Sequence, residues 1–293
     1  MEMDFVKKWE RAVLELGVPE VAYDTKSRII EDCESLYSFG LILNPYRFKS
    51  CGKVDNECKL CYALENAEKN ESVKICESEN YIVIPNISPI IKSASVVIRR
   101  GVGDDERKMY RTTDLNGLDR EFEEVFGLSR DLGVHLVHNS PGAGASISRH
   151  EHWHLVDYEQ VYSEIGEYGF DSAEIVDSSV KGVRRMVDFP FAHLVFEEDV
   201  DRIINFLKRL HSEIGSEYNG EGVPHGLVKS SRGVLVVPAK RYVEGRGVGG
   251  GDMAGHLLCK ASDEFEGADY NYCIERLSRT LFRKDEIDLE SFL

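Results

Sequence analysis

Hydrophobic and polar positions alternate with two different periods along the chain. Over residues 3–17, apolar side chains recur every three or four positions, which predicts a helix with one buried face. The same spacing predicts helices over 26–36, 114–132, 199–214 and 269–282. Short apolar runs bounded by Pro, Gly and Asn predict strands over 38–43, 81–86, 93–100, 134–140, 149–158, 191–197, 225–230 and 233–238. This order predicts an α+β fold, with antiparallel sheets and flanking helices.

A glycine-rich stretch, VEGRGVGGGDMAG (243–255), interrupts the pattern of the second half. It lacks the G-K-[ST] ending of a phosphate-binding P-loop. We interpret it as a flexible connection, able to serve as a lid, and not as a nucleotide cradle. The polar run that follows Cys61, ENAEKNES, is expected to be exposed.

Charge and cysteine content narrow the functional class. The 293 residues include 36 Lys and Arg against 52 Asp and Glu, a net charge of −16, which disfavours a nucleic acid polymer as partner. No apolar run approaches the roughly 20 residues of a membrane span, and the N-terminus does not resemble a signal peptide. Seven cysteines, an odd number without a secretory signal, predict reduced thiols and a cytoplasmic protein.

The most informative stretch is NSPGAGASISRHEHWHLV (139–156). Its three histidines, His150, His152 and His154, occupy alternate positions, so on a strand all three imidazoles lie on one face. Trp153 and Leu155 then lie on the opposite face, where we expect the core. The preceding loop of small residues, which includes Gly142, Gly144, Ala145 and Ser146, can bring backbone N–H groups close to a phosphate.

These features together are suited to transfer of a phosphorus group. A neutral imidazole can attack an α-phosphorus and form a covalent nucleotidyl-histidine. Loop amides and the neighbouring imidazoles can stabilise charge on the non-bridging oxygens.

The same stretch resembles the active-site strand of the histidine triad (HIT) superfamily. More narrowly, it is similar to the branch that contains galactose-1-phosphate uridylyltransferase, diadenosine tetraphosphate phosphorylase and the GDP-hexose phosphorylases. The resemblance makes His152 the nucleophile and matches Asn139 to the asparagine before the glycine loop. It implies His152, His154 and Ser146 as catalytic residues and Asn139 as a substrate-binding residue. From the residues themselves we also expect substrate contacts from the loop positions Gly142, Gly144, Ala145 and Ser148, from Arg149 as an extra positive charge near the phosphates, and from Asn86 at the end of a strand. His154 stands where this branch usually has Gln.

The resemblance extends over most of residues 38–270. LILNPYRFKS with CKLC, and the paired strands of ENYIVIPNISPIIKSASVVIRR, are similar to the early part of these proteins. HGLVKSSRGVLVVPAK and GGGDMAGHLLCKASDEFE are similar to their second half. The implied fold is an internal pseudo-dimer of two HIT-like halves. Residues 1–160 carry the nucleophile strand and the cysteine cluster, and residues 161–293 form a degenerate half that completes the substrate site.

A structural zinc site is implied by the same resemblance. Cys58 and Cys61 form C-x-x-C, and in uridylyltransferases of this branch such a pair binds zinc with the first triad histidine, here His150. Cys51 would complete a set of three thiolates and one imidazole, which is a normal zinc environment. Cys76 is another candidate and would make a four-thiolate site, and free thiols are the alternative to metal.

Other polar residues are weaker candidates. Arg47, Lys49, Arg99 and Arg100 are candidate phosphate or base donors, and Lys229, Lys240 and Arg241 are candidates for a sugar phosphate. His135 and His138 are an odd number of positions apart, so on a strand they point to opposite faces.

The resulting prediction is a nucleotidyltransferase or phosphorylase that acts through His152. Its substrate would be a nucleoside diphosphate sugar or a dinucleoside polyphosphate, with phosphate or a sugar phosphate as acceptor, and it would be a monomer or homodimer. The alternatives are a histidine-triad nucleotide hydrolase, which His154 favours, and a non-enzymatic zinc-binding sensor.

Overall fold

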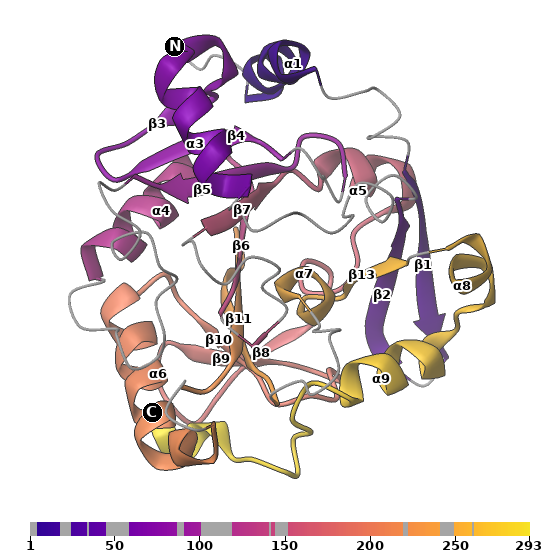
Figure 1. Cartoon of the computed structure of the whole chain (residues 1–293). Coiled ribbons are helices and arrows are strands. Elements are labelled where there is room, and N and C mark those ends of the chain that lie inside the picture. Colours follow the sequence, from indigo (N-terminus) through magenta and orange to yellow (C-terminus); the bar gives the residue numbers. More distant parts are fainter. Residues whose placement is uncertain are drawn as a thin grey trace.

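Thirteen strands in the described part of the chain form two sheets, one of ten strands and one of three (Figure 1). They are seen in a computed structural model of the whole chain. The structure describes residues 5–17, 25–33, 35–44, 59–86, 91–100, 119–140, 142–143, 152–218, 222–240, 249–259 and 261–293. Among them, no helix has the length and apolar character needed to cross a membrane.

The ten-stranded sheet consists of two five-stranded halves with the same strand order. The first half contains β3 (Cys76–Glu77), β4 (Tyr81–Pro85), β5 (Ser95–Arg99), β7 (His152–Val156) and β6 (His135–Asn139), in that spatial order. From the opposite edge inward, the second half contains β8 (Ile175–Asp177), β9 (Val183–Met186), β10 (Leu194–Phe196), β12 (Gly233–Pro238) and β11 (His225–Ser230). The halves join where β6 pairs antiparallel with β11. The sheet is therefore palindromic, as expected for an internal pseudo-dimer of two similar halves.

In each half, one long helix connects the third strand, counted from the outer edge of the sheet, to the fifth strand. These helices are α4 (Asp119–Leu132) and α6 (Val200–Ile214), and Figure 1 shows both on the same side of the sheet. Asp199 caps α6 by accepting a hydrogen bond from the backbone N–H of Arg202 at 3.1 Å. The two helices and α1 (Phe5–Leu16) bury a single core against this face, which we call the helix face.

The opposite face, which we call the site face, is covered by other elements. Over the first half lies α3 (Lys59–Lys69), whose Leu60 and Leu64 pack on Ile82 and Ile98. Over the second half lies the small sheet of β1 (Lys26–Asp32), β2 (Ser35–Leu43) and β13 (His256–Cys259). The remaining helices are α5 (Glu159–Ile165), α7 (Gly250–Met253), α8 (Ser262–Gly267) and α9 (Tyr270–Ser278), with short 3₁₀ turns at 71–73, 215–218 and 289–292.

The small sheet combines segments from both ends of the chain. β2 pairs antiparallel with β1 and parallel with β13, so His256 lies beside Gly40. The helix predicted over 26–36 is therefore wrong, because this segment forms β1 and the start of β2. Its apolar residues meet the underlying core as a strand, and Arg28 donates hydrogen bonds to the carbonyls of Phe265 and Ala268 at 2.5 and 2.7 Å.

Most of the other predicted elements are confirmed. The strands predicted over 225–230 and 233–238 have those bounds, and the helices predicted over 3–17, 199–214 and 269–282 form α1, α6 and α9 with shorter ends. The polar run after Cys61 is largely exposed, as expected, and its first part, 65–69, lies in the helix α3. The glycine-rich stretch is expected from the sequence to be a flexible connection. This is wrong for its described part, because 250–253 form the helix α7. Positions 243–248 lie outside the described residues.

Candidate active site

The strand β7 places His152 and His154 on the face opposite Trp153, as the alternation predicts. His152 is buried, with 4% of its surface exposed, and the ring centroids of His152 and His154 are 5.3 Å apart. Trp153 points to the helix face, where it packs edge-on against Phe122 at 5.1 Å between centroids. This packing fixes which face each residue of β7 takes, because a shift of one residue would exchange the two faces.

Asn139 lies beside His152 in the sheet. β6 and β7 are antiparallel, with Val137 opposite His154. Continuing this register by two residues places Asn139 opposite His152, and both residues belong to their strands. Cross-strand partners project to the same face. The two residues matched to the HIT motif are therefore neighbours on the site face.

The described beginning of the glycine loop is anchored to the second half of the sheet. Ser140 donates its backbone N–H to the carbonyl of His225 at 3.0 Å, and its hydroxyl accepts the backbone N–H of His225 at 2.7 Å. Gly142 is exposed and has φ of +85°, a conformation that favours glycine. The other predicted loop residues, Gly144, Ala145, Ser146, Ser148, Arg149 and His150, lie outside the described residues.

A short helix from the second half of the chain also reaches this point. Gly250, the first residue of α7, donates its backbone N–H to the side-chain oxygen of Asn139. A Cβ on Gly250 would lie 2.8 Å from Val137 and 3.0 Å from the carbonyl of His138, so only glycine permits this approach. Gly226, paired with Asn139 in the sheet, likewise leaves room for Met253 of α7.

Asp252 and Arg276 hold α7 in place. One Asp252 oxygen accepts the backbone N–H of Gly249 at 3.0 Å, and the other accepts Leu258 N–H at 3.2 Å and Arg276 at 2.9 Å. Arg276, on α9, also donates to the carbonyl of Leu258 at 2.9 Å. Burial disfavours the charged guanidinium, but the Asp252 carboxylate together with Tyr272 and Glu264 outweighs this effect and raises the pKa of Arg276. A continuous chain of contacts thus runs from α9 through α7 to Asn139.

Two fully buried histidines, His138 and His225, lie behind the site. His138 points to the helix face, with its ring centroid 4.2 Å from that of Trp153, whereas His135 bonds to Asp171 at 2.9 Å. The opposite orientations predicted for His135 and His138 are thus confirmed. Burial lowers the pKa of His138 and of the neighbouring His225 to about 3, so both rings are neutral at ordinary pH.

The remaining candidates fall at different places. Asn86 is buried at the end of β4, and its backbone N–H bonds to Ala94. Arg99 pairs with Glu121 at 2.5 Å, and Arg100 pairs with Glu77 at 3.3 Å, so both are engaged in ion pairs. Lys240 pairs with Glu286 at 2.7 Å. Arg47, Lys49 and Arg241 lie outside the described residues.

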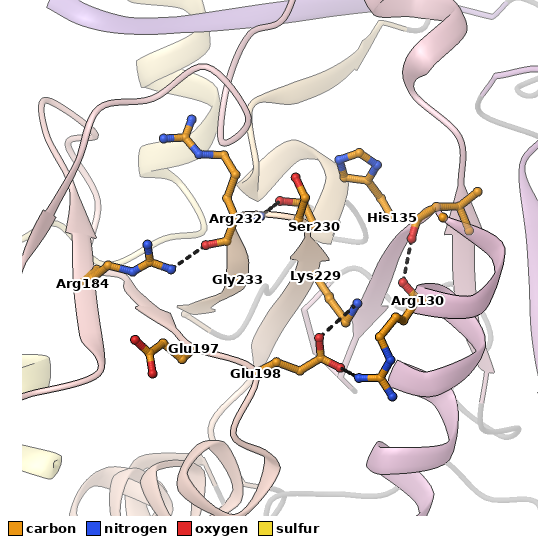
Figure 2. A pocket seen from close by; sticks show the side chains of 13 residues that line it. Arg130, His135, Arg184, Glu197, Glu198, Lys229, Ser230, Arg232 and Gly233 are labelled. Carbon is orange, nitrogen blue, oxygen red and sulfur yellow. Dashed lines mark hydrogen bonds and ion pairs between the residues drawn. The ribbon is translucent and has the colours of Figure 1, made fainter.

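Lys229 does not share the triad face. It pairs with Leu136, a residue of the helix-face core, whereas the next residue, Val137, pairs with His154. The sheet therefore separates Lys229 from His152 and His154, and its contact with a sugar phosphate stays a prediction. Lys229 lines a cavity elsewhere (Figure 2).

The structure leaves the predicted metal set untested. Cys51, Cys58 and His150 lie outside the described residues, and of Cys61 only the helical backbone in α3 is described. Within the described ranges, no three His, Cys, Asp or Glu side chains gather in a way that could hold a metal ion. Cys76 is a partly buried free thiol whose pKa burial raises to about 11.

No protein-family model matches the chain, and no curated protein matches its sequence. The crystal structure of yeast Ap4A phosphorylase Apa2 in complex with Ap4A matches 95% of this chain and 96% of its own, with a TM-score of 0.63 and 14% sequence identity. The chain has the Ap4A phosphorylase fold. A second Apa2 structure matches 97% of this chain and 96% of its own, with a TM-score of 0.62 and 16% identity. The complex of Apa2 with AMP matches 97% and 98%, with a TM-score of 0.58 and 15% identity.

This likeness confirms the fold that the resemblance of the triad strand implied. The similarity spans both halves of the chain, so the second half belongs to the same architecture as in Apa2. The sequence analysis missed Gly250, Asp252 and Arg276 as residues of the site. The signal was the run of glycines before an aspartate in GGGDMAG, which allows a backbone to approach a strand closely.

Proposed function

We propose that this protein is a nucleotidyltransferase of the phosphorylase type, which forms a covalent nucleotidyl-histidine at His152. The observation that carries the proposal is the placement of Asn139 opposite His152, with His154 on the same face. This arrangement puts a nucleophile, a polar amide and a second imidazole at the start of the glycine loop. It fits the histidine-triad chemistry predicted from the sequence.

In the first step, an unprotonated ring nitrogen of His152 attacks the α-phosphorus of the substrate. A P–N bond forms, and the P–O bond to the departing nucleotide or sugar phosphate breaks. In the second step, an oxygen of the acceptor phosphate or sugar phosphate attacks the same phosphorus, and the P–N bond breaks to restore the imidazole. Because Asn139 accepts the Gly250 N–H with its oxygen, its NH₂ group remains available to donate to a phosphate oxygen.

The substrate in this proposal is a dinucleoside polyphosphate or a nucleoside diphosphate sugar. Apa2, which has the same fold, has been crystallised with Ap4A and with AMP. We also propose the division into halves at 1–160 and 161–293, with the second half completing the site. The contact of Gly250 with Asn139 supports that role.

We further propose a structural zinc ion held by Cys58, Cys61, His150 and Cys51. Three thiolates and one imidazole suit zinc chemically. α3 begins one residue after Cys58 and packs on Ile82 and Ile98, next to the triad strand and on its face. When bound, the ion would tie this helix to the start of β7.

A labelling experiment tests the nucleophile. The protein is incubated with Ap4A or ADP-glucose labelled at the α-phosphorus, quenched in base, and examined for an alkali-stable, acid-labile adduct. Wild-type protein should carry the label and His152→Gly should not. His211→Gln, on α6, serves as the control and should label normally. An unlabelled wild-type protein, or a labelled His152→Gly variant, would refute the covalent mechanism and favour the sensor alternative.

Hydrolysis is the second candidate, because His154 occupies the position where Gln is usual in the transferase branch. Its side chain neighbours His152, so it can assist a water molecule as acceptor. Product analysis with and without added phosphate separates the two. With phosphate as acceptor, a phosphorylase releases the transferred nucleotide as a nucleoside diphosphate, whereas a hydrolase releases it as the monophosphate whether or not phosphate is present.

A further inference from the structure

A cavity of about 520 Å³ opens at the turn between β11 and β12 (Figure 2). Its lining comes from the end of α4, the start of β6, β9, the turn before α6 and the hairpin itself. In the palindromic sheet, this hairpin is the counterpart of β6 and β7 with their glycine loop. The cavity lies at the His135 end of β6, about 13 Å along the strand from Asn139. It is therefore separate from the triad site.

Lys229 is a buried cation whose ion pair with Glu198 is long. Only 7% of its surface is exposed, and it is the one lysine that is buried among the described residues. Its ammonium lies 3.4 Å from an oxygen of Glu198, and the other oxygen of Glu198 is bonded to Arg130 at 2.7 Å. Charge-assisted hydrogen bonds are about 2.7–2.9 Å long. Lys229 thus makes no such bond within the described part of the chain, although burial of a lysine normally requires one.

Arg184 brings a second cation to the cavity. Its guanidinium donates to the carbonyl of Arg232 at 2.6 Å, and its buried Nε has no hydrogen-bond partner. No carboxylate in the described residues forms an ion pair with it. Gly233, with φ of +126°, makes room for this side chain, since a Cβ there would lie 3.1 Å from the guanidinium.

The charges around the cavity favour an anion. Four cationic side chains and two carboxylates line it: Arg130, Arg184, Lys229, Arg232, Glu197 and Glu198. The local excess is positive in a chain whose net charge is −16. Ser230 accepts the backbone N–H of Arg232 at 3.1 Å, which leaves its hydroxyl proton free to donate.

We propose that this cavity is a second phosphate-binding site, with Lys229 and Arg184 as its charged donors and Ser230 as a neutral one. Two cationic donors match the two negative charges of a phosphate group, and the volume is in the range of small-molecule sites. The ligand is a phosphate group, carried either by the free ion or by a small phosphorylated molecule. It binds in the degenerate half, away from the reacting histidine.

Equilibrium dialysis with radiolabelled orthophosphate at low ionic strength tests the proposal. The variants Lys229→Met and Arg184→Gln should each bind phosphate at least about tenfold more weakly, because each loses a charged hydrogen bond. Lys240→Met removes the same charge outside the cavity and should bind as wild type does. His152→Gly should keep this binding, which separates the second site from the triad. Competition with AMP should displace the label if the ligand is a phosphorylated molecule and leave it if the ligand is the free ion.

The proposal is overturned if wild-type protein binds no phosphate, or if both cavity variants bind it with wild-type affinity. It is also overturned if His152→Gly loses the bound phosphate while both cavity variants keep it. Thermal unfolding of each variant shows whether it is folded. If Lys229→Met does not fold, phosphate binding by Arg184→Gln decides the test.

Discussion

Asn139 accepts a hydrogen bond from the backbone N–H of Gly250, although 111 positions separate them in the sequence. Asn139 ends a strand of the first half, and Gly250 begins a helix of the second. Since Asn139 also lies opposite His152, the second half orients a residue next to the proposed nucleophile. The second half of the chain thus contacts a residue beside the proposed nucleophile.

This contact predicts that Gly250→Ala damages the site. The new Cβ would press on Val137 and on the carbonyl of His138, so α7 must move away from Asn139. We expect nucleotidyl transfer to fall at least about tenfold, and the free energy of unfolding to fall by about 1–3 kcal/mol. Gly251→Ala is the control, because its Cβ would meet nothing closer than 3.6 Å. Equal activity of the two variants would show that α7 does not position Asn139.

The ion pair of Asp252 and Arg276 should be energetically coupled. Both side chains are largely buried, with 14% and 22% exposed, and Asp252 also accepts two backbone N–H groups. A double-mutant cycle with Asp252→Ala and Arg276→Ala should give a coupling of about 1–3 kcal/mol by urea unfolding. The exposed pair Glu275 and Arg279 on the same helix should give about 0.5 kcal/mol or less. Similar values for the two pairs would contradict the inferred role of this clasp.

Much of the site could be predicted from the sequence because its signals are local. Alternation within HWHLV determines which face each side chain takes, and the glycine loop follows directly from the strand before it. The placement of α7 could not be predicted, because it depends on a contact between residues 139 and 250. The error over 26–36 has the same cause: its helical spacing is outweighed by pairing with β2, which β13 supports from the other end of the chain.

The tight fit of Gly40 under Tyr168 provides a test of this small sheet. A Cβ on Gly40 would lie 1.8 Å from the buried Tyr168 ring, which has no exposed surface and cannot move outward freely. Gly40→Ala should therefore lower the free energy of unfolding by about 1–3 kcal/mol. Gly127→Ala, in the helix α4 with nothing closer than 3.8 Å, should raise it by up to about 1 kcal/mol. Urea unfolding of both variants checks the opposite signs.

Stability should fall as the solution becomes acidic. Burial lowers the pKa of four described histidines to about 3: His138, His193, His225 and His256. In the unfolded chain their pKa is about 6.5, so below that pH only the unfolded state takes up protons. The free energy of unfolding should drop between about pH 6.5 and pH 3, by at most about 1.4 kcal/mol per pH unit for each histidine.

His193 allows this slope to be attributed to one residue. Its Nε2 accepts the backbone N–H of Met186 at 2.8 Å, and its Nδ1–H donates to the carbonyl of Phe191 at 2.7 Å. A protonated ring could not accept the first bond. His193→Gln should therefore reduce the acid-dependent slope by about one proton, measured by urea unfolding between pH 4.5 and pH 7.5. An unchanged slope would mean that His193 is already protonated in the folded protein.

Removal of the proposed zinc should affect folding more than chemistry. Cys58→Ser or Cys61→Ser should lose about one equivalent of metal by elemental analysis, because each removes a proposed thiolate ligand. The exposed thiol of Cys33 is the matched control, and Cys33→Ser should retain the metal. The melting temperature should fall in the first two variants, and residual folded protein should still form the adduct at His152. Metal-free wild-type protein that is as stable as the metal-bound form would argue for free thiols instead.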